Sequence, residues 1–138
     1  VIAGDGELRQ QLHDQAAALG ITGSVNFVGK VSNINDYYRD SDMALMTSRY
    51  EGLPLVLLEA KSWSLPVVAY DCPTGPQEII NHGEDVFLVP MNDKATFLAR
   101  MEQLASDDRL FFAMSEKTKE TALKFDGNQI KQSWLALV

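Results

Sequence analysis

Two glutamates, Glu51 and Glu59, flank a Gly-Leu-Pro turn and an apolar run in the stretch SRYEGLPLVLLEA. Pro54 suits the first position of a helix, where its missing N–H costs nothing and its φ is already helical. Gly52 and Leu53 then lie at the helix start, where free backbone N–H groups and the helix dipole favour phosphate. The two carboxylates can accept hydrogen bonds from hydroxyl groups on either side of it. The stretch therefore predicts a receptor for a nucleotide sugar.

A simpler interpretation of the same stretch stays open from the residues alone. Glu51 is then a solvated loop residue, Glu59 is an exposed helix residue, and the apolar residues between them are only core. Metal binding by Asp40 and Asp42 is disfavoured, because this pair precedes a predicted strand instead of following one. The chain's two histidines are also too few to suggest a zinc site.

Short apolar runs alternate with longer amphipathic runs along the chain, which predicts an α/β fold with a parallel sheet. In such a sheet, ligands bind beyond the carboxyl ends of the strands, and the 48–60 stretch follows a predicted strand. The expected strands are 1–3, 25–28, 43–46, 67–69 and 86–89. The expected helices are 7–19, a short one within 33–42, 54–63, 77–81, 92 or 93 to 104, one from 108, and one after 127. In the last of these, Ile130, Trp134 and Leu137 are spaced to pack on a neighbour.

Composition and charge limit the class of protein. A chain of 138 residues with 46% hydrophobic and 22% charged residues predicts one soluble globular domain over residues 1–138. The net charge of -7 argues against a nucleic-acid partner, and the single cysteine fits a reducing cytoplasm. Because the first residues, Val-Ile-Ala-Gly, have the pattern of a strand interior, we expect the sequence to be a fragment.

Three motifs in order resemble one known family. EGLPLVLLEA resembles the Glu-x7-Glu motif of retaining family 4 glycosyltransferases, and FVGKV before it and PVVAYDCPTGPQEIINHGEDVFLVP after it resemble the same family. Within the last of these motifs, the Asp-Cys-Pro-x-Gly-Pro-x-Glu form resembles that of bacterial enzymes that build exopolysaccharide, capsule or lipopolysaccharide. The resemblance runs from Val1 to about Asp93. It implies the C-terminal, donor-binding half of a GT-B fold: a Rossmann-like parallel sheet with helices on both faces and a C-terminal helical tail.

The resemblance also implies roles for individual residues. Glu51 contacts the hydroxyls of the donor sugar and is the implied catalytic residue, and Glu59 binds the ribose hydroxyls. Backbone of Gly52, Leu53, Pro54 and Leu55 holds the sugar and the diphosphate, and backbone of Val28, Gly29, Lys30 and Val31 contacts the nucleotide base. The roles of Arg49, Asp71 and Glu78 stay open.

The implied reaction transfers a hexose or N-acetylhexosamine, with retention of configuration, from a nucleoside-diphosphate sugar, with UDP preferred. The acceptor is a growing glycan or lipid-linked glycan in cell-surface polysaccharide synthesis, and neither a metal nor a cofactor is needed. An N-terminal domain that binds the acceptor, and an upstream Arg and Lys that hold the diphosphate, are not in this sequence. We therefore expect the chain alone to be inactive, and the full-length protein to be cytoplasmic or peripheral at the inner face of the plasma membrane.

Two other functions remain as alternatives. The first is a sugar-nucleotide epimerase or a phosphorylase of the same architecture. An epimerase would need a histidine or carboxylate as general base, and neither His13 nor His82 lies in a convincing motif for that role. The second is a non-catalytic α/β binding module, in which the two glutamates have no chemical role.

Overall fold

The computed structural model describes residues 1–74 and 79–136, which form two compact units, 1–37 and 38–138. The expectation of a single domain over residues 1–138 stays a prediction. Each unit is built from parallel strands and helices in alternation, as the sequence pattern predicted.

The first unit contains a two-stranded parallel sheet. Its elements are β1 (Ile2–Ala3), α1 (Arg9–Ala18), the 3-10 turn η1 (Thr22–Ser24), β2 (Phe27–Gly29) and most of α2 (Ile34–Arg39). In the sheet, Ile2 pairs with Phe27 and Ala3 with Gly29. The ring centroids of His13 on α1 and Phe27 on β2 are 4.1 Å apart, so the helix packs against one face of this sheet.

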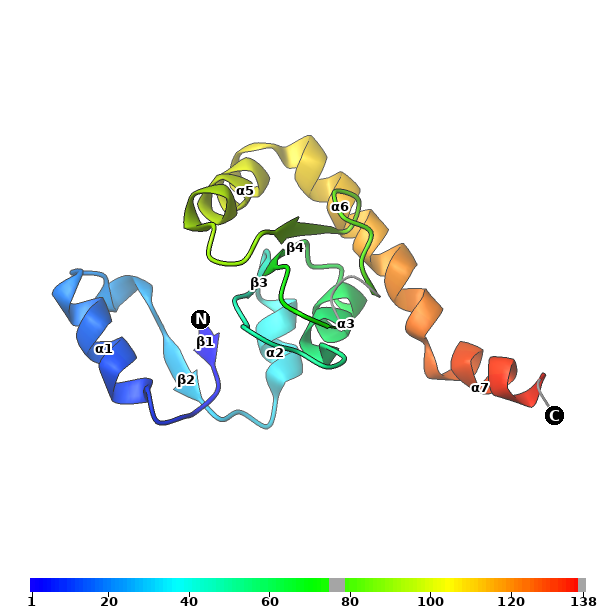
Figure 1. Cartoon of the computed structure of the whole chain (residues 1–138), viewed down its shortest axis with the longest axis horizontal. Helices are drawn as coiled ribbons and strands as arrows, with labels where there is room; N and C mark the ends of the chain where they lie inside the picture. Colours follow the sequence, from blue (N-terminus) through cyan, green and yellow to red (C-terminus); the bar gives the residue numbers. More distant parts are fainter. Residues whose placement is uncertain (75–78, 137–138) are drawn as a thin grey trace. The chain divides into compact units, whose positions relative to one another are not determined.

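The second unit contains a three-stranded parallel sheet in the order β3 (Ala44–Met46), β4 (Val67–Tyr70) and β5 (Val86–Val89) (Figure 1). Ala44 pairs with Val67, and Val67 pairs with Val86. All five predicted strands are present, with small shifts at their ends. β4 and β5 are short runs of mainly β-branched or long apolar residues, which suits strands buried on both faces.

Helices cover both faces of the second sheet, as predicted. α5 (Lys94–Ser106) packs on β4 and β5, and α3 (Leu55–Ser62) packs on β3 and β4. Successive strand residues point to opposite faces. The core on the α5 side consists of Val68, Phe87, Val89, Phe97, Leu104 and Met114. The last of these, Met114, belongs to α6 (Asp108–Ala122). On the opposite face, Val67, Ala69 and Val86 are fully buried.

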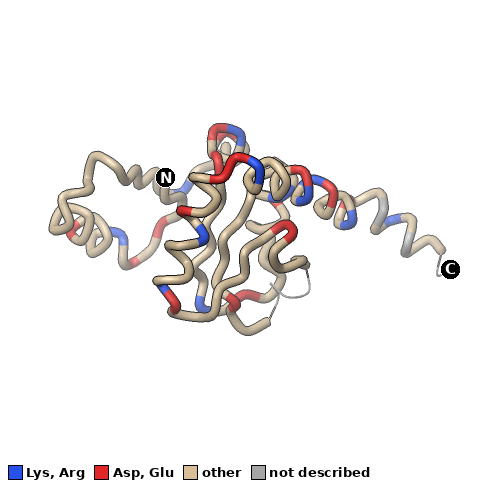
Figure 2. The backbone as a smooth tube through the Cα atoms, turned by 90° about the horizontal axis from the view of Figure 1, so that it is seen from above, with Lys and Arg blue, Asp and Glu red and all other residues tan. Residues whose placement is uncertain are grey.

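The last helices form the predicted helical tail. Asp93 caps α5, because its carboxylate accepts a hydrogen bond from the Thr96 N–H. Acidic and basic residues are interspersed along α6 (Figure 2). The 3-10 turn η2 (Leu123–Phe125) leads into α7 (Gly127–Leu135). Within the described chain, Ile130 and Trp134 are exposed, so the prediction that they pack on a neighbour is wrong for this part of the protein. Leu137, the third residue of that prediction, lies outside the described residues. Every helix among the described residues is too short or too polar to cross a bilayer.

Candidate functional site

The start of α3 lies beyond the carboxyl end of β3, where the sequence predicted a phosphate site. The helix begins at Leu55, and Pro54 precedes it with φ -75 and ψ 85. The prediction that Pro54 is the first helical residue is therefore wrong, because this ψ keeps it outside the helix. Its carbonyl accepts from the Leu57 N–H at 2.9 Å, so Pro54 closes the first turn instead.

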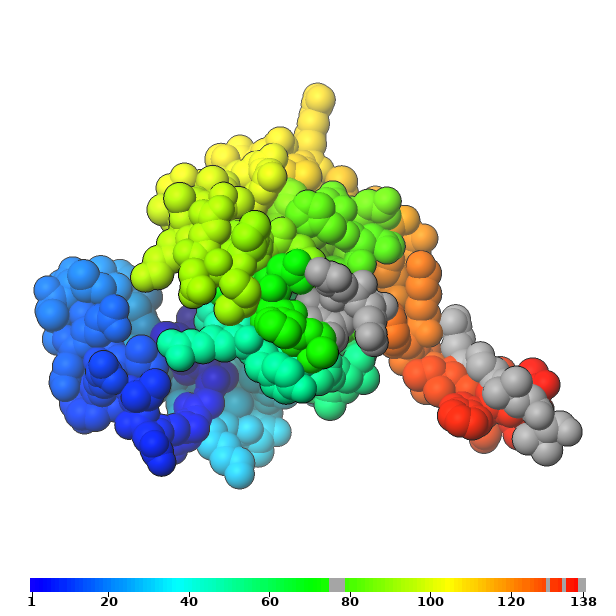
Figure 3. Space-filling model, in the orientation of Figure 1, coloured from blue at the N-terminus to red at the C-terminus, as the bar shows by residue number. Residues whose placement is uncertain are grey.

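The first turn of α3 exposes backbone donors. Among the described residues, no side chain caps this helix, and the N–H groups of Leu55 and Val56 have no partner within it. Both residues are exposed, and the 47–54 loop lies at the surface seen in Figure 3. Two N–H groups without a partner inside the helix, at the positive end of a helix dipole, are the kind of donors that favour an anion such as phosphate.

Glu51 is fixed through its main chain. Its carbonyl accepts a hydrogen bond from the Thr74 hydroxyl, so the loop after β3 is fastened to the loop after β4. Cys72 is buried beside it, and burial, followed by the nearby Glu51 carboxylate, raises the pKa of the Cys72 thiol. Glu51 itself is half-buried. The parallel sheet thus brings two strand-end loops together at Glu51, as a shared carboxyl edge predicts.

Glu59 is fixed through its carboxylate. The Tyr38 hydroxyl of α2 donates to Glu59 Oε2 at 2.9 Å. Tyr38 is 8% exposed, whereas Glu59 is exposed. Burial and the bond to Glu59 raise the pKa of Tyr38, which keeps its hydroxyl protonated as a donor. The sequence interpretation did not identify this partner.

A buried ion pair on the other side of α3 was also missed. Lys61 Nζ donates to Asp85 Oδ2 and to the Ile79 carbonyl, both at 2.8 Å, and Lys61 and Asp85 are fully buried. Asp85 also accepts from the Thr121 hydroxyl at 2.7 Å and from the Asn81 N–H at 2.9 Å. The network ties α3 to α6 and to the segment before β5. The signal available in the sequence was Lys61 itself, a lysine that directly follows Ala60 in a mainly apolar run.

The predicted base-binding backbone lies in the first unit. Val28 and Val31 are half-buried and Lys30 is exposed. Gly29 has φ +69, and a Cβ at this position would lie 3.1 Å from Arg9 Nη1. Arg9 also lines a cavity of about 160 Å³ next to the carboxyl end of β1. This places a guanidinium beside the Val28–Val31 backbone, a cation that the sequence interpretation did not assign to the site.

The structure thus gathers Glu51, Gly52–Leu55 and Glu59 within the second unit and places Val28–Val31 in the first. Glu51 is half-buried and Leu55 and Glu59 are exposed, so these three residues lie at the surface.

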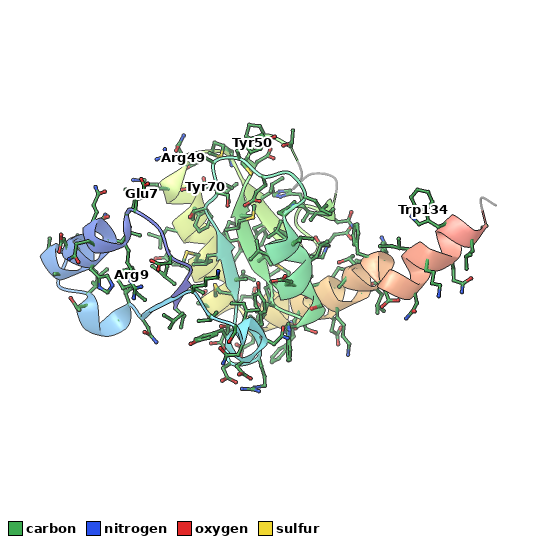
Figure 4. The ribbon with its side chains drawn as sticks, turned by 90° about the horizontal axis from the view of Figure 1, so that it is seen from below. Glu7, Arg9, Arg49, Tyr50, Tyr70 and Trp134 are labelled. Atoms are coloured by element: carbon green, nitrogen blue, oxygen red, sulfur yellow. The ribbon has the colours of Figure 1, made fainter. Side chains whose placement is uncertain are left out.

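The residues whose roles were left open differ in position. Arg49 and Tyr50 project from the loop after β3, away from the sheet (Figure 4). Asp71 is half-buried directly after β4, and its N–H donates to the Val89 carbonyl at 2.7 Å. Glu78 and most of the expected helix 77–81 lie outside the described residues.

Solved structures share this fold. The crystal structure of Anabaena HepE in complex with UDP-glucose superposes with a TM-score of 0.85 at 25% identity, covering 97% of this chain and 40% of that one. The C-terminal domain of a glycosyl transferase group 1 family protein, LpcC from Francisella tularensis, superposes with a TM-score of 0.76 at 23% identity. That match covers 86% of this chain and 62% of the LpcC domain. The Rossmann-like fold predicted from the sequence is confirmed.

Sequence relatives include bacterial glycosyltransferases. The amylovoran biosynthesis glycosyltransferase AmsD of Erwinia amylovora is 35% identical over 97% of this chain and 38% of its own length. An N-acetyl-D-galactosaminyltransferase of Campylobacter jejuni, named for a glycan on PP-undecaprenol, is 30% identical over 100% of this chain and 38% of its own. The chain thus spans less than half the length of these relatives. Residues 1–124 match the family described as glycosyl transferases group 1, and the chain belongs to this family.

Proposed function

We propose that this chain is the donor-binding half of a retaining glycosyltransferase that acts in cell-surface polysaccharide synthesis. The observation that carries the proposal is the uncapped start of α3 between two carboxylates, Glu51 and Glu59, at the carboxyl edge of a parallel sheet. Membership of the glycosyl transferases group 1 family supports it, as do the UDP-glucose complex of HepE and the polysaccharide named for AmsD.

The proposed donor is a nucleoside-diphosphate hexose or N-acetylhexosamine, with UDP preferred. The N–H groups of Leu55 and Val56 bind the diphosphate, and the Glu51 carboxylate accepts hydrogen bonds from the sugar hydroxyls. Glu59 accepts from the ribose hydroxyls, and the backbone of Val28–Val31 contacts the base. The loop residues Gly52–Pro54 contribute through the backbone, where small or ring-closed residues allow close approach.

The proposed reaction needs no protein nucleophile. The bond from the anomeric carbon to the diphosphate oxygen breaks, and a bond to the acceptor oxygen forms on the same face. The acceptor hydroxyl loses its proton to the departing diphosphate. Amides at the start of α3 stabilise the negative charge on the diphosphate, and Glu51 favours positive charge at the anomeric carbon.

A transfer assay on the complete protein that contains this chain tests the proposal. Radiolabelled UDP-hexoses and UDP-N-acetylhexosamines are incubated with glycan acceptors, and labelled glycan with retained configuration is the expected product. Conversion of the donor without an acceptor would indicate an epimerase, and dependence on inorganic phosphate would indicate a phosphorylase. The chain alone is expected to bind the nucleoside diphosphate without transferring sugar.

We propose that transfer proceeds without a resident metal or cofactor, because helix amides supply the stabilisation that a divalent cation would otherwise give. The complete protein is expected to keep its rate of transfer when EDTA is added in excess over any contaminating cation. Loss of transfer in EDTA, restored by Mg²⁺ or Mn²⁺, would contradict the proposal.

We also propose that the acceptor is a glycan or lipid-linked glycan bound outside this chain, and that the complete protein works in the cytoplasm or at the inner face of the plasma membrane. The name of the Campylobacter jejuni relative, with its PP-undecaprenol-linked glycan, supports this acceptor class. Fractionation of cells tests the location. Release of the protein from membranes by high salt is expected for peripheral association.

A further inference from the structure

Tyr38 is the partner of the glutamate that the proposed function assigns to the ribose. Its hydroxyl donates to Glu59 Oε2 at 2.9 Å across a separation of 21 residues in the sequence. The ring belongs to α2 and is 8% exposed, so packing holds the hydroxyl in place. The glutamate belongs to α3 and its side chain is exposed.

The position of Glu59 on α3 relates it to the diphosphate site. It follows Leu55 by four residues, so both lie on the same face of the helix. At about 1.5 Å of rise per residue, the two are about 6 Å apart along the helix axis. A nucleoside diphosphate carries its ribose next to its phosphates, and Glu59 is therefore placed where the ribose hydroxyls of such a ligand would be.

A carboxylate presents two oxygens with about four lone-pair directions between them. The bond from Tyr38 uses one direction on Oε2 and restricts the rotamers that the group can adopt. Without it, an exposed glutamate samples several rotamers and loses that freedom when it binds. With it, the remaining directions are presented in one orientation, which suits two neighbouring hydroxyls.

We propose that Tyr38 is a positioning residue that orients Glu59 toward the 2′- and 3′-hydroxyls of the donor ribose. The inference rests on the proposed function, because it takes Glu59 to be the group that binds the ribose. It predicts that Tyr38 contributes to the preference for ribonucleotide over 2′-deoxyribonucleotide donors without contacting the ligand.

The test is a set of calorimetric titrations of the complete protein with UDP and with 2′-deoxy-UDP. The wild type is compared with Tyr38→Phe, with Glu59→Ala, which removes the acceptor oxygens altogether, and with the double variant. In the wild type, UDP is expected to bind more tightly than 2′-deoxy-UDP. Tyr38→Phe is expected to weaken UDP binding by about two- to tenfold, the cost of ordering one free side chain on binding, and to reduce the preference. In the Glu59→Ala background, which leaves Tyr38 no carboxylate to orient, Tyr38→Phe should change neither affinity further.

Tyr37→Phe serves as the matched control, because it removes a hydroxyl from the neighbouring position of the same helix. It is expected to bind both ligands as the wild type does. Thermal melts of each variant report folding. If Tyr38→Phe weakens UDP and 2′-deoxy-UDP equally, or only lowers the melting temperature, its role is structural and the inference is overturned.

The experiment distinguishes failure of the inference about Tyr38 from failure of the proposed ribose role of Glu59. If Glu59→Ala loses the preference for UDP while Tyr38→Phe binds like the wild type, the inference fails and the ribose role of Glu59 stands. If Glu59→Ala binds both ligands like the wild type, the ribose role in the proposed function fails, and the inference fails with it.

Discussion

Glu51 and Glu59 are held in different ways, and this difference suits different tasks. Thr74 holds the main chain of Glu51 at the junction of two strand-end loops, whereas Tyr38 holds the carboxylate of Glu59. A carboxylate on a fixed backbone can meet a reacting sugar, and an oriented carboxylate can bind a diol. The residues themselves were predictable, because their spacing along one stretch is local information. Tyr38 was not, because a contact over 21 residues depends on packing.

Replacing Glu51 tests its role in transfer. Glu51→Gln keeps the shape of the side chain and removes its charge. We expect kcat to fall by about 10²-fold or more with little change in KM for the donor, because the charge acts mainly in the transition state. Steady-state kinetics of the complete protein measure both constants. Glu116→Gln, an exposed change on α6, is the control. A rise in KM at unchanged kcat would show instead that Glu51 only binds the donor.

Gly29 combines a left-handed backbone with the close approach of Arg9. Gly29→Ala places a Cβ 3.1 Å from Arg9 Nη1 at φ +69, and the backbone strain costs about 1–2 kcal/mol. We expect a lower free energy of unfolding in urea and weaker UDP binding, since the Val28–Val31 backbone shifts. Gly23→Ala is the matched control, because a Cβ there meets nothing within 4 Å. Equal stability of the two variants would contradict this account of Gly29.

At the scale of elements, α3 has two sides with different tasks. In the proposed function its start and Glu59 bind the donor, while Lys61 joins the buried network with Asp85 and Thr121. The helix and the strands were predictable from apolar periodicity and from Gly and Pro positions. The place of Pro54 was missed by one residue, because composition does not decide which carbonyl closes the first turn. The ion pair was missed because its partners are 24 residues apart.

The buried pair predicts a marked asymmetry between single and double substitutions. Lys61→Met leaves the Asp85 carboxylate buried without its cation, which costs about 3–5 kcal/mol of unfolding free energy. Lys61→Met combined with Asp85→Asn removes both charges and keeps an acceptor for the Asn81 N–H. The new amide NH2 can donate to the Thr121 hydroxyl, which still donates to the Lys117 carbonyl, so most of this loss should be recovered. Urea unfolding measures each variant, and Lys119→Met, at an exposed position of α6, is the control. A double variant no more stable than the single one would contradict the prediction.

At the scale of the whole molecule, the alternation of strands and helices predicted the parallel sheets and the carboxyl edge where the site lies. The strand order β3-β4-β5 was not predictable, because apolar runs do not specify their neighbours. The packing predicted for Trp134 was wrong, because helical spacing of apolar residues does not say whether their partner lies in the same chain. The chain spans 38% of AmsD, so acceptor and linkage are questions for the complete protein.

The most direct test is a crystal structure of the complete protein with an intact UDP-sugar. We predict diphosphate oxygens within about 3 Å of the Leu55 and Val56 nitrogens, the sugar hydroxyls at Glu51 and the ribose hydroxyls at Glu59. A diphosphate bound away from the start of α3, with these amides facing solvent and both carboxylates turned from the ligand, would contradict the account.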